Sequence, residues 1–196
     1  MEASETGNAA TCKLAGSSHD SVVLIGFRGS GKSTVGRILA EALGLELADT
    51  DLMVTSAAGL TIREIFDRGG EALFRQLEKQ AVKQAATKPH AVISVGGGAI
   101  LDAENTKMLK ACGTVIWLDA PAQVLWERIS ADCASSASRP NLTSSGGLTE
   151  VEALLARRKG LYAAAADIIV PADGNQNDTA QRIMAILRKR KGSTPE

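Results

Sequence analysis

The stretch Val22-Val-Leu-Ile-Gly-Phe-Arg-Gly-Ser-Gly-Lys-Ser-Thr34 decides the fold. An apolar run enters a loop with the spacing of a phosphate-binding loop (P-loop): Gly26, four residues, then Gly31, Lys32 and Ser33. Glycines let the backbone wrap a phosphate with its N–H groups pointing inward, and the following helix presents its positive end to the same anion. The alternative is a glycine-rich turn with an unrelated lysine. The strand-like run before the loop and the helical periodicity after it argue against that alternative.

The composition limits the possible functions. A chain of 196 residues predicts one domain with a tail at each end. Apolar residues make up 44% but aromatic residues only 3%, so the core must be built from Ala, Val, Leu and Ile. The formal charge is zero, so nothing global attracts nucleic acid or an anionic membrane, and we expect neither partner. Any anion site must therefore be local.

The location of the protein follows from its cysteines and its first residues. Three scattered cysteines indicate reduced intracellular thiols rather than a disulfide framework. Residues 1–20 are small and polar without an apolar segment, and no apolar stretch is long enough to cross a bilayer. We expect a cytoplasmic protein with a disordered leader over 1–20, a domain over 21–190 and a tail over 191–196.

Strand-like and helix-like segments alternate along the chain. Strands are predicted over residues 22–26, 45–48, 91–95, 114–118 and 168–170. Helices are predicted over residues 32–43, 61–67, 70–87, 103–110, 121–129, 148–164 and 178–189. The alternation predicts a parallel sheet with helices on both faces. Residues 131–147, rich in Ser, Gly and Ala, should form a mobile surface loop.

Three unusual motifs are predicted to meet at one edge of this sheet. The P-loop follows the first strand, the segment 49–51 follows the second, and the glycines 96–98 follow the third. Ligands of doubly wound sheets bind beyond the carboxyl ends of the strands. Three glycines cost backbone entropy, so either a close ligand approach or a tight turn must explain them.

Asp49 and Asp51 are candidate polar groups of this site. In an extended segment, a spacing of two places both side chains on one face. One carboxylate could serve the water shell of Mg²⁺, and the other could receive a hydroxyl and its proton. The alternative is that Asp51 caps a helix. Asp119, after four apolar residues, competes with Asp49 for the metal, but we favour Asp49 and expect Asp119 to cap the next helix.

Taken together, the motifs resemble the shikimate kinase family, small P-loop kinases of the nucleoside-monophosphate-kinase type. The resemblance covers about residues 21–187 and rests on the blocks 26–34, 49–51, 70–75, 96–98, 139–142 and 158–162. It implies a three-layer α/β/α fold with a five-stranded parallel sheet and a mobile lid over 131–147. It also implies ATP-dependent phosphorylation of the 3-hydroxyl of shikimate, on the route to chorismate, by a monomer.

The resemblance implies roles for residues on the nucleotide side. The ATP phosphates would be held by Gly29, Ser30, Gly31, Lys32, Ser33 and Thr34. Mg²⁺ would bind Ser33 directly and Asp49 through water. Arg139 on the lid would meet the phosphates and Arg128 would flank the adenine.

It implies roles on the acceptor side as well. Asp51 would bind the substrate hydroxyls and is the candidate base. Arg75 and Arg158 would clamp the carboxylate, although surface ion pairs and helix-dipole compensation are the ordinary explanations for these arginines. The backbone of Gly96, Gly97 and Gly98 would lie against the substrate, with Gly97 contacting a hydroxyl.

The chain departs from the family pattern at two positions. Gly160 stands where proline is frequent, so we expect a looser helix end there. Asn141 stands where an apolar residue is common, which affects packing of the lid. Two other functions remain open: a related hydroxy-acid kinase such as a gluconate kinase, and a kinase-like binding protein without turnover.

Overall fold

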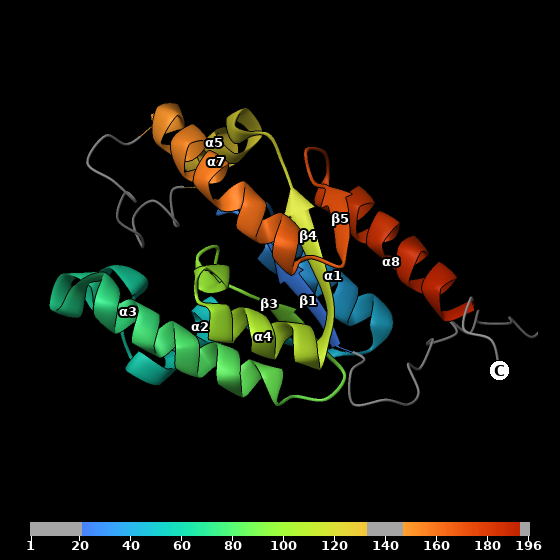
Figure 1. Ribbon diagram of the computed structural model, residues 1–196, viewed down its shortest axis with the longest axis horizontal. Helices are drawn as coiled ribbons and strands as arrows, with labels where there is room; N and C mark the ends of the chain where they lie inside the picture. The colour runs from blue at the N-terminus through green and yellow to red at the C-terminus, as the bar shows by residue number, and fades with distance from the viewer. Residues whose placement is uncertain (1–20, 133–146, 193–196) are drawn as a thin grey trace, which may run out of the picture.

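A five-stranded, all-parallel sheet forms the centre of the molecule (Figure 1). The computed structural model describes residues 21–132 and 147–192. The strands are β1 (Ser21–Ile25), β2 (Glu46–Asp49), β3 (Ala91–Ser94), β4 (Gly113–Asp119) and β5 (Ile168–Pro171). Their order is β2-β3-β1-β4-β5, so the strand before the P-loop lies in the middle and is buried along its whole length.

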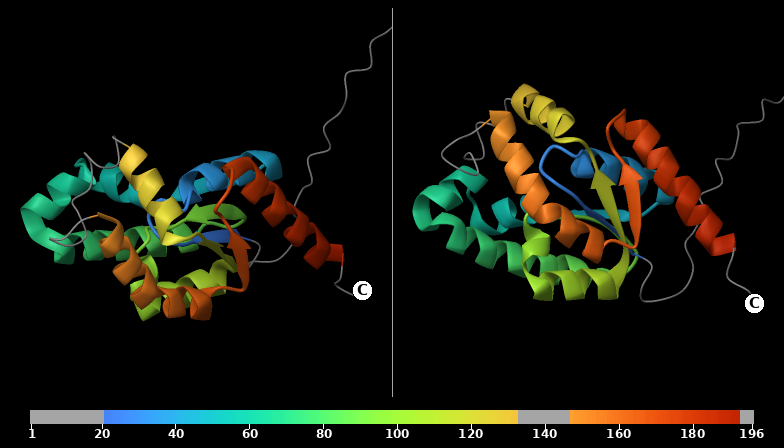
Figure 2. Two further views of the ribbon diagram at one scale, coloured as in Figure 1. Left: turned by 90° about the horizontal axis from the view of Figure 1, so that it is seen from above. Right: turned by 45° about the horizontal axis from the view of Figure 1, so that its top comes forward.

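Helices cover both faces of the sheet and complete three layers (Figure 2). They are α1 (Lys32–Leu43), α2 (Thr50–Ala58), α3 (Ile62–Ala86), the 3₁₀ turn η1 (Ala99–Leu101), α4 (Ala103–Cys112), α5 (Ala122–Ala131), α7 (Gly147–Ala165) and α8 (Gln176–Gly192). Helices α1 and α8 pack together on one face, while α4 and α7 pack against β4 from the other. The predicted α/β class and the five predicted strands are confirmed.

The core consists mainly of small and branched apolar side chains. The buried cluster is dominated by Val, Leu, Ile and Ala from β1, β3 and β4. Val23 is paired with Ile93 on one side and Val115 on the other, and all three are buried. Such continuous apolar strands are typical of parallel sheets covered on both faces.

The predicted helices 61–67 and 70–87 are confirmed, but one helix was missed. Element α3 contains both predicted helices, joined across a kink at Gly70, whose φ of 64° and ψ of −164° are not helical. Its start is set by a capping box between Thr61 and Glu64. Helix α2 was not predicted, because it buries only Thr50 and Val54 and therefore lacks an apolar stripe.

Two helix-end predictions are wrong as well. Pro121 rather than Asp119 is the N-cap of α5. Helix α7 continues through Gly160 to Ala165, so no loose end forms at that glycine. Among the helices of the described ranges, none combines the length and the apolarity that crossing a bilayer requires.

The strand order places the three motifs side by side. Strands β2, β3 and β1 are neighbours, and all run in the same direction. Their carboxyl ends therefore bring together the P-loop, the β2–α2 junction and the glycines after β3, as predicted. Of the predicted lid, residues 133–146 lie outside the described ranges, and Arg139 lies among them.

The position of Leu24 in β1 allows a test of this core. We expect Leu24→Ala to lower the free energy of unfolding by about 2–5 kcal/mol, because a cavity adds to the lost transfer energy. Leu52→Ala, at a leucine that is 67% exposed, should change it by less than about 0.5 kcal/mol. Urea unfolding followed by circular dichroism measures both, and equal losses would contradict the assigned core.

Candidate active site

The P-loop connects β1 to α1 and has an anion-binding geometry. Gly31, the N-cap of α1, adopts φ 88°, a left-handed conformation that favours glycine. Because glycine has no side chain to cap the helix, the first N–H groups of α1 stay available for an anion. The loop therefore has the backbone that the sequence predicted.

Lys32 lies across this loop and is buried. Its ammonium Nζ donates to the carbonyl oxygens of Gly26 at 2.9 Å and Phe27 at 2.8 Å, and lies 3.4 Å from Ser30 Oγ. These contacts hold the cation above the turn that the glycines form. The backbone of the P-loop thus holds a positive charge at this end of β1.

Ser33 and Asp49 form a direct pair at the entrance of α1. The Ser33 hydroxyl donates to Asp49 Oδ2 at 2.6 Å. The other carboxylate oxygen of Asp49 accepts from the backbone N–H groups of Asp51 at 3.0 Å and Leu52 at 3.4 Å. Asp49, not Asp51, is therefore the N-cap of α2, and the expectation of an extended 49–51 segment is wrong because Thr50 already begins the helix.

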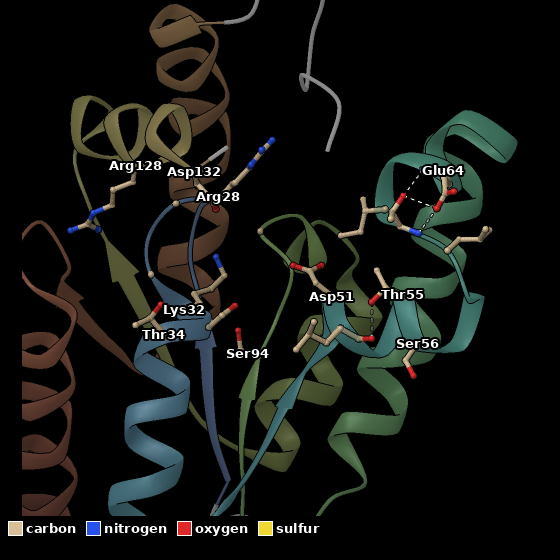
Figure 3. A pocket seen from close by; sticks show the side chains of 18 of the residues that line it. Arg28, Lys32, Thr34, Asp51, Thr55, Ser56, Glu64, Ser94, Arg128 and Asp132 are labelled. Atoms are coloured by element: carbon tan, nitrogen blue, oxygen red, sulfur yellow. Dashed lines mark hydrogen bonds between the residues drawn. The ribbon is translucent and has the colours of Figure 1, made fainter. Parts of the chain in front are cut away.

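Asp51 lies in the first turn of α2 and faces a large cleft. Figure 3 shows its carboxylate pointing toward the space between the P-loop and the α2–α3 turn. The cleft has a volume of about 1060 Å³. Its lining includes eight of the predicted site residues: Gly29, Gly31, Lys32, Ser33, Thr34, Asp51, Gly97 and Arg128. Of the other described ones, Ser30, Asp49, Arg75, Gly96, Gly98 and Arg158 are not part of the lining.

Each glycine of the segment 96–98, called here the glycine loop, lies against a different neighbour. A Cβ on Gly96 would come within 2.6 Å of Glu78 Oε1 and 3.0 Å of Asp51 Oδ1. A Cβ on Gly97 would lie 3.1 Å from the backbone nitrogen of Arg28 in the P-loop. A Cβ on Gly98 would overlap the guanidinium of Arg75. Close approach of protein groups therefore explains why three glycines follow β3.

Arg75 is held by two carboxylates of its own helix. Its Nη1 donates to Glu78 Oε2 at 2.7 Å, and its Nε and Nη2 donate to Glu71 Oε1 at 3.1 and 3.0 Å. Burial lowers the pKa of Arg75, but the charge and hydrogen bonds of Glu78 and Glu71 outweigh it and raise the pKa overall. The Glu78 side chain is only 2% exposed, so this is more than a surface ion pair.

Arg158 reaches the same region from α7. Its guanidinium lies over the ring of Phe27 in the P-loop, 5.5 Å from the ring centroid. A cation above an aromatic face is stabilised by the ring quadrupole. Arg158 thus connects α7 to the P-loop. The helix-dipole explanation is wrong, because α7 continues to Ala165 and its last turn holds no basic residue.

Arg128 takes part in a different contact. It donates to the backbone carbonyls of Ala172 at 2.8 Å and Gly174 at 2.6 Å. These bonds fix the loop between β5 and α8. Gln176, the first residue of α8, lines the cleft. Arg128 therefore shapes the side of the cleft that lies near the N-terminus of α8.

Sequence reasoning missed three residues of this region. Glu78 received no role beyond the surface ion pairs considered for Arg75, and neither Phe27 nor Tyr162 received a role. Tyr162 is fully buried, and its hydroxyl donates to Gly97 O at 2.5 Å. Glu78 lies three residues after Arg75 on a helix, but its burial follows from packing against the glycine loop, which no local spacing reveals.

Comparison with known proteins agrees with this geometry. The family model described as shikimate kinase matches residues 28–188. A shikimate kinase from Moorella thermoacetica is 45% identical over 79% of this chain and 86% of its own. The chain belongs to the shikimate kinase family.

Solved structures support this family assignment. The shikimate kinase from Acinetobacter baumannii, determined in complex with shikimate, superposes with a TM-score of 0.82 at 33% identity, over 88% of this chain and 95% of that one. A gluconokinase from Sinorhizobium meliloti reaches a TM-score of 0.53 at 15% identity, over 88% of this chain and 93% of that one. The second likeness shows the common fold alone.

The two carboxylates on Arg75 can be separated by experiment. We expect Glu78→Gln to lower the free energy of unfolding by about 1–3 kcal/mol, because the half-buried guanidinium of Arg75 loses its charged acceptor. Glu71→Gln, at a side chain that is 67% exposed, should cost less than about 1 kcal/mol. Urea titrations of both variants measure this, and equal small effects would show that Glu78 does not hold Arg75.

Proposed function

We propose that this chain transfers the γ-phosphoryl group of ATP to the 3-hydroxyl of shikimate, giving shikimate 3-phosphate. The observation that carries the proposal is the glycine loop, which lies against the P-loop backbone through Gly97 and against Arg75 through Gly98. A phosphate cradle and a cation suited to a carboxylate thus adjoin one short segment. Membership of the shikimate kinase family supports shikimate as the acid.

On the nucleotide side, the N–H groups of the P-loop would bind the phosphates. The residues involved are Gly29, Ser30, Gly31, Lys32, Ser33 and Thr34. Lys32 would move from the loop carbonyls to the outer phosphate oxygens. Arg128 would present its flat guanidinium beside the adenine while it holds the β5–α8 loop.

Ser33 and Asp49 fit a magnesium site. A hydroxyl and a carboxylate oxygen lie 2.6 Å apart, and both are the hard oxygen donors that Mg²⁺ prefers. Ser33 would bind the ion directly and Asp49 would hold its water shell. Bound there, Mg²⁺ would neutralise charge on the phosphates during transfer.

On the acceptor side, the acid would lie across the glycine loop. Arg75 and Arg158 would bind its carboxylate, since the planar guanidinium matches a carboxylate better than an ammonium does. The Gly97 N–H would contact a hydroxyl of the acid. Because Gly96 and Gly98 carry no side chain, Glu78 and Arg75 can lie close to the glycine loop. Asp51 would accept the hydrogen bond, and then the proton, of the attacking hydroxyl.

Two further parts of the proposal concern the lid and the whole unit. Arg139, outside the described residues, would approach the phosphates when the lid over 131–147 closes and excludes water, which competes as acceptor. The kinase unit would span residues 21–190 and act as a cytoplasmic monomer. The zero formal charge supports the absence of nucleic-acid and membrane partners.

A substrate panel tests the function against its two alternatives. ADP release would be measured in a coupled assay with shikimate, gluconate and related hydroxy acids. We expect turnover with shikimate alone. Turnover of gluconate but not of shikimate would favour the related hydroxy-acid kinase. ATP binding without any ADP release would favour a kinase-like binding protein.

The role of Asp51 predicts a selective loss of turnover. Asp51→Asn should lower kcat by about 10²-fold, because the proton acceptor is lost, while ATP affinity stays unchanged. Glu64→Gln is a matched control: Glu64 lines the same cleft, and glutamine preserves its capping box. Steady-state kinetics and ATP titration measure both, and unchanged turnover in Asp51→Asn would remove its role.

The double role of Asp49 can also be separated. Asparagine caps helices as well as aspartate, so Asp49→Asn should leave the free energy of unfolding within about 0.5 kcal/mol. It removes the charge beside Ser33, so the half-saturating Mg²⁺ concentration should rise about tenfold. Titration of activity with Mg²⁺ at fixed ATP measures this. An unchanged Mg²⁺ requirement would place the ion elsewhere.

A further inference from the structure

Tyr162 is a buried group that the proposed chemistry does not use. It is the only tyrosine of the chain and lies on α7, one turn after Arg158. Its ring stacks on Trp117 of β4 with centroids 5.7 Å apart and planes 21° apart. Its hydroxyl crosses to the glycine loop and donates to Gly97 O at 2.5 Å.

The hydroxyl remains a donor under ordinary conditions. Burial raises the pKa of Tyr162 to about 12, even though Arg158, through its charge and a hydrogen bond, acts to lower it. The charges of Glu78 and Arg75 also act on the hydroxyl, the first raising the pKa and the second lowering it. Both arginines proposed for the carboxylate therefore interact electrostatically with Tyr162.

The bond to Gly97 O has a geometric consequence. The carbonyl of Gly97 and the N–H of Gly98 belong to one rigid trans peptide unit and point in opposite directions. Glycine backbones rotate with little steric restriction, so a loop of three glycines does not fix this unit by itself. A donor aimed at Gly97 O sets the plane of the peptide and hence the direction of the Gly98 N–H.

This peptide unit lies between the two halves of the site. Gly97 contacts the P-loop backbone, and Gly98 contacts the Arg75 guanidinium. Because Tyr162 and Arg158 share one face of α7, the bond that fixes the peptide also fixes Arg158 relative to Arg75. Loss of the hydroxyl would release the loop and the second arginine together.

We propose that Tyr162 is a positioning residue for the acid substrate. Tyr162 holds the Gly97–Gly98 peptide in one orientation and keeps α7 in a fixed position relative to that peptide. The inference rests on the proposed function, since it concerns the shikimate side of that site. It assigns Tyr162 no contact with reacting atoms. The nucleotide side should be insensitive to it, because the phosphates bind the amides of the P-loop.

Tyr162→Phe tests this by removing only the hydroxyl while keeping the stack on Trp117. We expect the KM for shikimate to rise about tenfold and the KM for ATP to stay within about twofold, given a hydrogen bond of ordinary strength. Ser21→Ala is the matched control. It removes a buried hydroxyl that bonds the backbone of Lys88 and Ala91, near the amino end of the sheet. It should lower the thermal midpoint without moving either KM.

The outcomes separate this inference from the proposed function. If the unmodified enzyme turns over shikimate but Tyr162→Phe leaves its KM unchanged, or shifts both KM values equally, the positioning role is wrong. If the unmodified enzyme does not turn over shikimate, the proposed function itself has failed.

A second measurement holds even if the phenylalanine variant does not fold. Because the chain has one tyrosine, tetrafluorotyrosine incorporated during expression changes Tyr162 alone. Fluorination acidifies the phenol, so the donor is lost as pH rises within the working range. The KM for shikimate should then increase with pH relative to the unmodified enzyme, while that for ATP does not. Parallel pH profiles for the two enzymes would overturn the inference.

Discussion

The close approach of the glycine loop to its neighbours is the constraint on which the site depends. At 96–98 the chain passes so near to Glu78, Asp51, the P-loop backbone and Arg75 that a Cβ on any of the three glycines would lie within 3.1 Å of a neighbouring atom. Parallel pairing of β3 with both β1 and β2 makes this approach possible, since it brings the ends of the three strands together. A hydrogen bond also links the β2–α2 junction to the glycine loop: the hydroxyl oxygen of Thr50 accepts from the Gly96 N–H at 3.0 Å.

Electrostatics is organised locally in a chain without net charge. The positive groups Lys32, Arg75 and Arg158 are each held by different chemistry: backbone carbonyls, carboxylates and an aromatic face. Each cation is therefore ordered before a ligand arrives. Preorganised charge of this kind is the main contribution that a protein makes to phosphoryl transfer, because the charged groups then need to rearrange little during the reaction.

The helical start at Thr50 changes the roles of the two aspartates. Sequence spacing suggested equivalent carboxylates on one face of an extended segment. The helix instead rotates Asp51 toward the cleft and leaves Asp49 buried, with one oxygen capping α2 and the other on Ser33. One short motif thus divides into a residue that caps α2 and pairs with Ser33, and a residue that faces the cleft.

The sequence by itself determined the P-loop, the five parallel strands and the edge at which the motifs meet. These features depend on local periodicity, glycine spacing and the general rule for parallel sheets. Only the tertiary structure decided that Asp49 is the cap, that Glu78 is buried against Arg75, that Arg158 lies over Phe27 and that Tyr162 holds Gly97. The Arg158–Phe27 and Tyr162–Gly97 contacts join segments far apart in the chain. The Asp49 cap and the Glu78–Arg75 pair are local, but both depend on burial by distant elements. Local spacing reports which side chains share a face, but packing decides what that face meets.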